Sequence, residues 1–401
     1  MSFSDLKQVE NNISFQVNDI DVSILNSIRR IILSEIPNVA FEFEPYNIED
    51  QKVKIIENTC PLHNEFIQQR LSMIPINLSV NEILNFNEDE YIFKLLKKNN
   101  TNNIIDVTTE DIEIYNSDDK KYDINFTRKI FPEKVITKDP IMKDFILITK
   151  LKPNLINNKN GDKIQIEMKA SKNIAKNYSG FGYVSQCVYY NIVNVILADK
   201  ELNKRIKELS NLKLNKSELD EEKKNLTDNF NNLDRDRFYY KNDYDEPNKF
   251  NYIIESECNV SPKYLFYKAL EIIHTKIENL FTKIVENKIQ FKLIENNNNM
   301  YQLFIDNEKH TLGNLIQSLI FNKYIRNDNK KIISYIGYYC QHPLDDNMFI
   351  KIKLTNDNDN INKIFKEALL YIQEEIKEII QIWIEFSDLN KNNYDDINKF
   401  I

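Results

Sequence analysis

The chain has 401 residues, 42% of them hydrophobic, which is enough for two or three domains with cores of their own. Its formal net charge of −8 excludes a general attraction to nucleic acid, and no apolar run approaches the length of a membrane-spanning helix, so we expect no membrane contact. The four cysteines, Cys60, Cys187, Cys258 and Cys340, are scattered along the chain, which disfavours a metal cluster and fits a reducing, intracellular compartment.

The first 184 residues predict strands alternating with short helices. Polar–apolar alternation indicates strands at residues 11–20 and within 39–57, and a helical period of apolar residues indicates helices at 22–36 and 64–76. From about 80 to 184 the pattern is a series of short strands with polar turns. We therefore expect a separate, mostly-β unit in this part of the chain.

The second part of the chain predicts longer helices. Residues 199–240 are highly charged with a thin apolar stripe, which is typical of an exposed helical hairpin. A helix at 262–285 starts at Ser261, the expected N-cap, and Pro262. The elements expected after it are a hairpin at 288–305, a helix at 310–324, strands at 332–339 and 348–354, and a final helix at 361–386.

The helices at 22–36 and 310–324 follow one plan. When the two are aligned, Ile28 matches Ile316 and Ile32 matches Ile320. Each half of the chain has strand, amphipathic helix, more strand and then a long helix. Because like elements often pair about a two-fold axis, this repetition predicts a covalent pseudo-dimer.

Several motifs carry a family resemblance. Three segments resemble the larger alpha-like subunit of cellular RNA polymerases, which is the third-largest subunit of polymerase II or its archaeal counterpart. They are NDIDVSILNSIRRIILSEIPNVAFE, ENTCPLHNEFIQQRLSMIPI and NGDKIQIEMKASKNIAKNYSGFGYV. KHTLGNLIQSLI and SYIGYYCQHPLDDNMFIKIKL resemble the smaller partner, the eleventh subunit of polymerase II or its archaeal counterpart. The two resemblances cover about residues 10–285 and 286–390. The presence of both alpha-like regions on one chain resembles the fused RNA polymerase subunits of large cytoplasmic DNA viruses.

The resemblance implies an α+β fold. It implies a pseudo-dimer of two alpha-like dimerisation domains, the first interrupted by a mostly-β insert domain and by the helical insertion at 199–240. The expected domains are a larger-subunit-like dimerisation domain at 1–45 and 185–285, the insert domain at 46–184, and a smaller-subunit-like dimerisation domain at 286–401.

The function implied is that of a non-catalytic assembly platform in a multisubunit DNA-directed RNA polymerase. Such a platform nucleates binding of the two largest, catalytic subunits, together with a small assembly subunit. The resemblance implies contact with nucleic acid only indirectly, through the complex, and no homodimer. If the chain is viral, we expect it in the host cytoplasm, in a viral factory, and in the virion.

The resemblance also implies an intramolecular dimer interface formed by the two similar helices and the final helix. Thr311 is expected to cap its helix, and Gly313 to let neighbouring backbone approach closely. The interface residues expected are Ile24, Leu25, Ile28, Ile31, Ile32, Leu312, Gly313, Leu315, Ile316, Leu319, Ile320, Ile372 and Ile376.

Arg29 and Arg30 lie in the middle of the first helix. Taken alone, they are most simply a solvated helix edge. The resemblance implies instead that they contact the large subunits. In the second half Gln317 and Ser318 stand in their places, so only one side keeps the basic pair. The other expected large-subunit contacts are Asn58, Thr59, His63, Glu65 and Arg70.

No catalytic constellation emerges from the sequence. The acidic segments DRDR at 234–237 and DYDE at 243–246 are candidates for magnesium binding by residue type only. Residues 80–184 contain no cysteine, so we expect neither the zinc nor the iron–sulfur cluster found in some relatives, and no other cofactor. Two alternatives remain: a non-polymerase structural protein that self-associates through its amphipathic helices, and a nucleotide-transferring enzyme that uses these acids.

Overall fold

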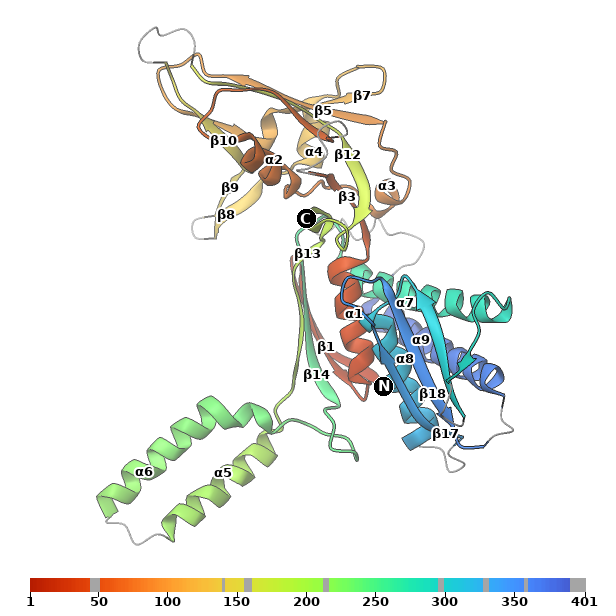
Figure 1. Ribbon diagram of the computed structural model, residues 1–401. Helices are drawn as coiled ribbons and strands as arrows, with labels where there is room; N and C mark the ends of the chain where they lie inside the picture. The colour runs from red at the N-terminus through yellow and green to blue at the C-terminus, as the bar shows by residue number, and fades with distance from the viewer. Residues whose placement is uncertain are drawn as a thin grey trace. The chain divides into compact units, whose positions relative to one another are not determined.

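The computed structural model is a mixed α/β protein that divides into two compact units (Figure 1). It describes residues 1–43, 51–138, 141–154, 161–211, 216–294, 299–326, 332–356 and 360–389. Unit 1 comprises Met1–Arg30, Gln186–Ile254 and Phe266–Leu389, and unit 2 contains Ile31–Ser185 and Glu255–Leu265.

Unit 1 contains two four-stranded sheets. The first has the strand order β1-β2-β14-β13, and the second has the order β15-β16-β18-β17. The strands of the first sheet are β1 (Ser2–Val9), β2 (Asn12–Asn18), β13 (Val184–Asn191) and β14 (Lys249–Ser256). Those of the second sheet are β15 (Lys292–Leu293), β16 (Met300–Asp306), β17 (Ile333–Tyr339) and β18 (Asn347–Leu354).

The two sheets have the same topology. Numbered within its own half, each sheet has the order first, second, fourth, third strand. In each half a helix follows the second strand, and a long helix follows the fourth. These helices are α1 (Val22–Ser34) and α7 (Pro262–Val285) in the first half, and α8 (His310–Ile320) and α9 (Ile361–Ser387) in the second. The repetition expected from the sequence is therefore present at the level of strand order.

The core of unit 1 joins elements of both halves. Trp383 on α9 is completely buried, and its ring centroid lies 5.1 Å from that of Phe3 on β1 and 4.8 Å from that of Phe15 on β2. It lies 4.2 Å from Phe266 on α7. The last helix of the chain thus packs into the aromatic core of the first sheet.

Unit 2 is built mainly of strands. Its largest sheet has the order β4-β11-β5-β7, and β10-β6, β12-β3 and β8-β9 form two-stranded pairs. The strands are β3 (Pro37–Phe41), β4 (Val53–Asn58), β5 (Tyr91–Lys98), β6 (Ile105–Thr108), β7 (Ile112–Asn116), β8 (Lys134–Lys138), β9 (Ile141–Asp144), β10 (Leu147–Leu151), β11 (Lys163–Met168) and β12 (Ala170–Ile174). It also contains α2 (Asn64–Ser72), α3 (Val80–Leu84) and α4 (Ile124–Ile130).

The charged insertion forms a helical hairpin, as expected from its sequence. Its helices are α5 (Val195–Ser210) and α6 (Lys216–Asn229), followed by a π-helical turn, η3 (Phe230–Asp234), and a 3₁₀ turn, η4 (Arg235–Arg237). Phe230 is buried beneath Arg205, whose guanidinium lies 5.1 Å from the Phe230 ring centroid. The hairpin runs away from β13 and β14 in Figure 1.

Several expected elements differ from the structure in detail. The mostly-β unit expected at residues 80–184 also holds two short helices, α3 and α4. The helix expected at 64–76 ends at Ser72. Ile74 precedes Pro75, and a residue before proline disfavours helical geometry, which fits this early end. The helix expected at 310–324 is α-helical only to Ile320 and continues as a π-helix, η5 (Phe321–Arg326). The division into three domains stays a prediction.

Candidate functional site

The first helix, α1, carries a cap and a fully apolar face. Asp21 precedes it and accepts a hydrogen bond from the backbone N–H of Ser23 at 2.7 Å, which identifies Asp21 rather than Ser23 as the cap. The five predicted interface residues on this helix are at most 1% exposed: Ile24, Leu25, Ile28, Ile31 and Ile32. Ser23 and Ser27 are buried on the same helix.

Helix α8 corrects the role expected for Thr311. The helix begins at His310, and its N-cap residue, Lys309, makes no side-chain capping bond. Thr311 is therefore inside the first turn and does not cap it. Its hydroxyl oxygen accepts a hydrogen bond from Arg30 Nε at 2.8 Å, and its carbonyl oxygen accepts one from the Ser27 hydroxyl at 3.2 Å.

Gly313 is a close-packing position, but side chains and not backbone approach it. A Cβ atom added there would lie 2.5 Å from Cδ2 of Tyr338 and 2.9 Å from the sulfur of Met348. Both side chains come from the second sheet. A glycine in the first turn of α8 is thus required because the Tyr338 ring and the Met348 thioether lie directly against the helix backbone.

Polar contacts link α1 and α8 reciprocally. At one end, Asp21 Oδ2 accepts hydrogen bonds from the Ser318 hydroxyl at 2.8 Å and from Asn322 Nδ2 at 2.6 Å. At the other end, Ser27 and Arg30 bond to Thr311. Residues from the middle or end of each helical segment therefore bind the N-terminal end of the other, which is the pattern expected of two elements related by a two-fold axis.

All thirteen predicted interface residues are buried. Those on α8 are Leu312, Gly313, Leu315, Ile316, Leu319 and Ile320, and those on α9 are Ile372 and Ile376. Burial is what an intramolecular interface requires, but it is equally what any core requires. Their assignment to a dimer-like interface stays a prediction.

The two arginines of α1 differ in their surroundings. Arg29 is half-buried and donates from Nε and Nη2 to Asn26 Oδ1, at 3.2 and 3.0 Å. Burial raises the pKa of the nearby Cys187 thiol to about 11, and the charge of Arg29 acts against this shift. Arg30 is exposed, yet it bonds to Thr311, so the missing arginines of the second half do not exclude an internal role.

The residues predicted between 58 and 70 lie together in unit 2, and most have structural partners. Asn58 Nδ2 donates to the carbonyl oxygen of Leu62 at 2.9 Å, and Thr59 Oγ1 accepts from the Lys163 backbone N–H at 2.7 Å. His63 caps α2. Arg70 donates to the carbonyl oxygen of Leu147 at 2.7 Å.

Glu65 differs from these four neighbours. It is exposed, and none of the side-chain hydrogen bonds or ion pairs found among the described residues involves its carboxylate. A contact role for the whole segment stays a prediction.

The acidic segments are occupied by ion pairs. Asp234 of DRDR lies 2.7 Å from Arg205 and 3.1 Å from Arg237. Glu246 of DYDE forms a two-pronged pair with Arg326, each contact 2.7 Å long, and this guanidinium lowers the pKa of Glu246. These carboxylates therefore stabilise the hairpin and the end of η5, and they do not converge on one point.

Neither a metal cluster nor a membrane-spanning helix occurs in the part of the chain that the structure describes. Within the described residues, no three or more His, Cys, Asp or Glu side chains gather closely enough to hold a metal ion. None of the helices described is long and apolar enough to cross a bilayer. The absence of a cofactor stays a prediction.

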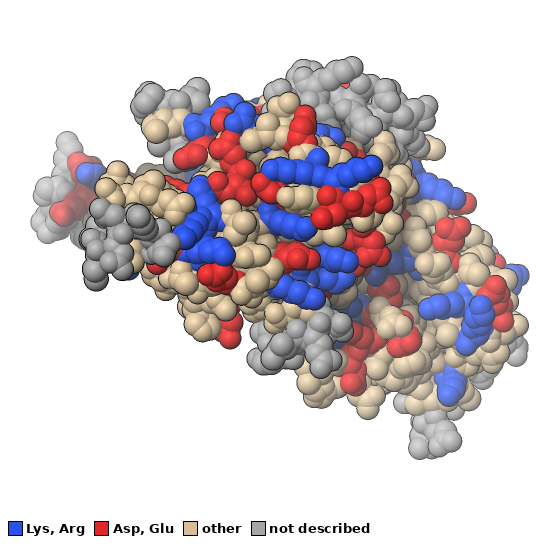
Figure 2. All heavy atoms as spheres, turned by 90° about the horizontal axis from the view of Figure 1, so that it is seen from above, with Lys and Arg blue, Asp and Glu red and all other residues tan. Residues whose placement is uncertain are grey.

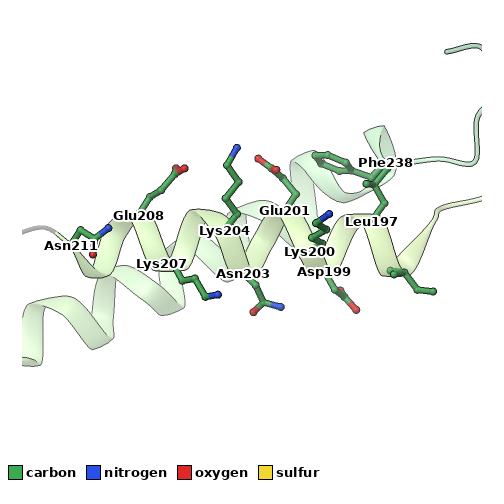
Figure 3. A pocket seen from close by; sticks show the side chains of 11 residues that line it. Leu197, Asp199, Lys200, Glu201, Asn203, Lys204, Lys207, Glu208, Asn211 and Phe238 are labelled. Atoms are coloured by element: carbon green, nitrogen blue, oxygen red, sulfur yellow. The ribbon is translucent and has the colours of Figure 1, made fainter. Parts of the chain in front are cut away.

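A hollow of about 1020 Å³ lies along α5 (Figure 3). Leu197 and Phe238 lie together at one end, whereas Asp199, Asn203 and Lys207 point away on the other side of the helix. Since its lining residues face different directions and are mostly charged, it is an open surface and not an enclosed reaction site.

Sequence reasoning missed the polar residues that connect the two halves. Asp21, Ser27, Ser318 and Asn322 were not predicted as interface residues, and Thr311 was given another role. One signal was available: Ser23 and Ser27 recur four residues apart on an otherwise apolar helix face, which indicates a close helix contact with polar bonds.

The sequence comparisons identify the family. Residues 14–277, more than half of the chain, match the family described as the RNA polymerase Rpb3/Rpb11 dimerisation domain, and residues 301–381 match a second family of the same description. The chain belongs to the RNA polymerase Rpb3/Rpb11 dimerisation-domain family. The two matched regions contain α1 and α8, respectively.

Curated relatives carry related names. The chain is 27% identical over 202 residues to "DNA-directed RNA polymerases IV and V subunit 3B" of Arabidopsis thaliana, covering 47% of this chain and 56% of that protein. It is 30% identical over 217 residues to "DNA-directed RNA polymerases I and III subunit rpac1" of Dictyostelium discoideum, covering 49% and 54%. It is 26% identical over 194 residues to "DNA-directed RNA polymerase subunit Rpo3" of Pyrobaculum arsenaticum, covering 48% and 63%. The chain thus spans little more than half the length of these relatives.

Proposed function

We propose that this chain is the assembly platform of a multisubunit DNA-directed RNA polymerase, with both alpha-like halves on one polypeptide. The observation that carries the proposal is the pairing of two regions of one dimerisation family, each with the same strand order, through Asp21–Ser318 and Arg30–Thr311. The insert domain, residues 46–184, would then lie within unit 2, and α5–α6 would be a lineage-specific insertion. If the chain is viral, such a fused platform would act in the host cytoplasm, in a viral factory, and in the virion.

The mechanism proposed is scaffolding. The platform brings the two largest subunits and a small assembly subunit together, and those subunits supply catalysis and nucleic-acid contact. Fusion replaces association of two separate halves by an intramolecular step, with an effective concentration on the order of millimolar for a flexible link. Because Trp383 of the second half lies in the core of the first sheet, the two halves form one folded unit before any partner arrives.

Two surfaces are proposed to contact the large subunits. One is the edge of α1 that carries Arg29 and Arg30, and the other is the segment from Asn58 to Arg70 with the exposed Glu65. A guanidinium group offers a rigid fork of donors that suits carboxylates and carbonyls on a partner. Arg30 also bonds through Nε to Thr311, so this edge of α1 is held against α8.

The experiment is purification of the tagged chain from cells that make the whole complex, followed by identification of the recovered proteins. The proposal predicts recovery of the two largest polymerase subunits with the wild-type chain. It predicts at least tenfold lower recovery with Arg29→Ala plus Arg30→Ala, since loss of desolvated charged contacts costs roughly 2–5 kcal/mol.

Thr311→Val is the matched control, because it removes the internal acceptor of Arg30 but keeps both arginines. Circular dichroism checks that each variant is folded. If Thr311→Val lowers recovery as much as the double arginine variant, the arginines act inside the chain and not on a partner. A wild-type chain that recovers only copies of itself favours the self-associating structural protein, and nucleotide transfer by the purified chain favours the enzyme.

A further inference from the structure

The second sheet of unit 1 has one covered face and one open face. Its inward residues, including Leu303, Ile350 and Ile352, are fully or nearly fully buried, and Tyr338 and Met348 of this face lie against α8. The outward residues alternate with them along the strands. In Figure 1, α8 and α9 lie together on one side of β17 and β18.

An aromatic row crosses the open face. Phe304 on β16 is paired directly with Phe349 on β18, which is paired with Tyr339 on β17. The ring centroids of Phe304 and Phe349 lie 5.2 Å apart, and those of Phe349 and Tyr339 lie 5.1 Å apart. Phe304 is 45% exposed and Tyr339 36%. Tyr335, 48% exposed, lies beside the row with its hydroxyl against Gly337.

Three lysines accompany the row. Lys351 lies two residues after Phe349 on β18 and is paired with Gln302 on β16 and Gly337 on β17. Lys353 on β18 and Lys292 on β15 lie on the same face. Among the ion pairs of the described residues, none involves these three lysines. Asp306, at the end of β16, accepts a hydrogen bond from Asn307. Over the described residues, the open face thus combines exposed aromatic rings with lysines that form no ion pair.

The largest sheet of unit 2 provides a contrast within the same chain. On its open face the cross-strand row reads Lys54, Glu167, Lys94, Glu113, so that charges of opposite sign alternate over four strands. Lys94 and Lys163 on this face are also paired with carboxylates, at 2.7 and 2.6 Å. Figure 2, which views the molecule from above, shows Lys and Arg side chains interspersed with Asp and Glu. A face of this kind is adapted to water.

We propose that the open face of the β15-β16-β18-β17 sheet is the docking surface for an apolar, acidic segment of one of the two largest polymerase subunits. The inference rests on the proposed function and extends it to a surface that carries neither predicted arginine. Clustered exposed aromatic side chains dominate the binding energy of protein interfaces. The lysines, which have no ion-pair partner among the described residues, select a partner segment that brings carboxylates, because complementary charge steers association and fixes register.

The ring geometry favours a protein occupant over single-stranded nucleic acid. A base needs an open aromatic face on which to stack. Here the Phe349 ring lies nearly parallel to Tyr339, with an interplanar angle of 14°, and the ammonium group of Lys351 lies 4.6 Å from the Tyr339 centroid. Tyr339 therefore offers mainly ring edges, which suit aliphatic and aromatic side chains.

Lysine acetylation with acetic anhydride tests the surface without mutation. The reactivity of Lys292, Lys351 and Lys353 is compared between the free chain and the complex purified through the tagged chain. The proposal predicts at least fivefold protection of Lys351 and Lys353 in the complex. Lys94, on the charge-paired sheet of unit 2, should change less than twofold.

A variant pair tests the aromatic row. Phe304→Ser with Tyr339→Ser should lower recovery of the large subunits at least fivefold after a salt wash. Leu96→Ser, which changes an apolar residue 61% exposed on the unit 2 sheet, should leave recovery within twofold. If the large subunits are recovered but the three lysines react equally in free chain and complex, the docking surface is refuted and the proposed function stands. If no polymerase subunit is recovered, both fail.

Two further outcomes overturn the assignment. In the first, the free chain binds a fluorescent oligouridylate, and Lys351→Glu abolishes this binding. The face would then be a nucleic-acid surface. In the second, the free chain sediments as a dimer, and Phe304→Ser with Tyr339→Ser converts it to a monomer. The occupant of the face would then be a second copy of this chain. The proposal predicts neither.

Discussion

The carboxylate of Asp21, which caps α1, accepts a hydrogen bond from the hydroxyl of Ser318 on α8 at 2.8 Å. In the register that aligns Ile28 with Ile316, Ser318 is the equivalent of Arg30, and Arg30 binds Thr311 at the start of α8. Two equivalent positions therefore each contact the start of the opposite helix, with different chemistry. Such an arrangement fits a two-fold interface whose halves have diverged within one chain.

The Asp21–Ser318 contact should show measurable coupling in a double-mutant cycle. We expect the coupling free energy between Asp21→Ala and Ser318→Ala to be about 1 kcal/mol in urea unfolding, because each partner is part-buried and one is charged. Ser210→Ala is the control, since its hydroxyl bonds to the carbonyl of Ile206 in its own helix. Coupling indistinguishable from zero would remove this contact from the interface.

Gly313→Ala should destabilise the protein although alanine is the better helix former. The added methyl group would lie 2.5 Å from Tyr338 and 2.9 Å from Met348, so the sheet would have to move away from α8. Overpacking of this kind costs about 1–3 kcal/mol, more than the helix-propensity gain of roughly 1 kcal/mol. Thermal unfolding gives the sign, and a melting temperature raised by the substitution would contradict the contact.

Trp383→Ala should be among the most damaging substitutions in unit 1. The side chain is fully buried against Phe3, Phe15 and Phe266, and large-to-small changes of this type cost about 3–5 kcal/mol. Leu370→Ala on the same helix is the control, because Leu370 is 43% exposed and should cost well under that amount. Equal losses for the two variants in urea unfolding would mean that Trp383 does not join the halves.

The α5–α6 hairpin should be dispensable for folding. Its apolar residues Ala198 and Phe230 are buried, and its ion pairs Arg205–Asp234 and Arg235–Asp199 close the hairpin on itself. A Gly/Ser link replacing residues 196–236 keeps the bridge between Val193 and Tyr239. Because loop closure depends weakly on length, we expect the melting temperature to change by no more than about 2 °C. A loss of several kcal/mol in unfolding would show that the hairpin supports the core.

The elements that could be predicted from the sequence are those with local signals. Ser261 and Pro262 mark the start of α7, and the final helix expected at 361–386 is observed at Ile361–Ser387, where Asn360 caps it. The repeat of the two halves was visible in the spacing of Ile24, Ile28 and Ile32. Apolar periodicity and caps act over a few residues, so a single sequence carries them.

The parts that could not be predicted depend on contacts between distant segments. Nothing local distinguishes Thr311 as a partner of Arg30 from Thr311 as a cap, because both uses fit the first turn of a helix. The ring that fills the space at Gly313 belongs to Tyr338, on another strand. The π-helical segment after Ile320 ends at Arg326, and Arg326 forms an ion pair with Glu246, eighty positions earlier in the chain. Tertiary structure decides each of these.

Native mass spectrometry of the complex purified through the tagged chain tests the central claim most directly. If one chain supplies both halves of the platform, the smallest stable assembly contains one copy of this chain and one copy of each of the two largest polymerase subunits. Two copies of this chain bridging the large subunits, or a chain bound to a separate alpha-like subunit, would contradict it.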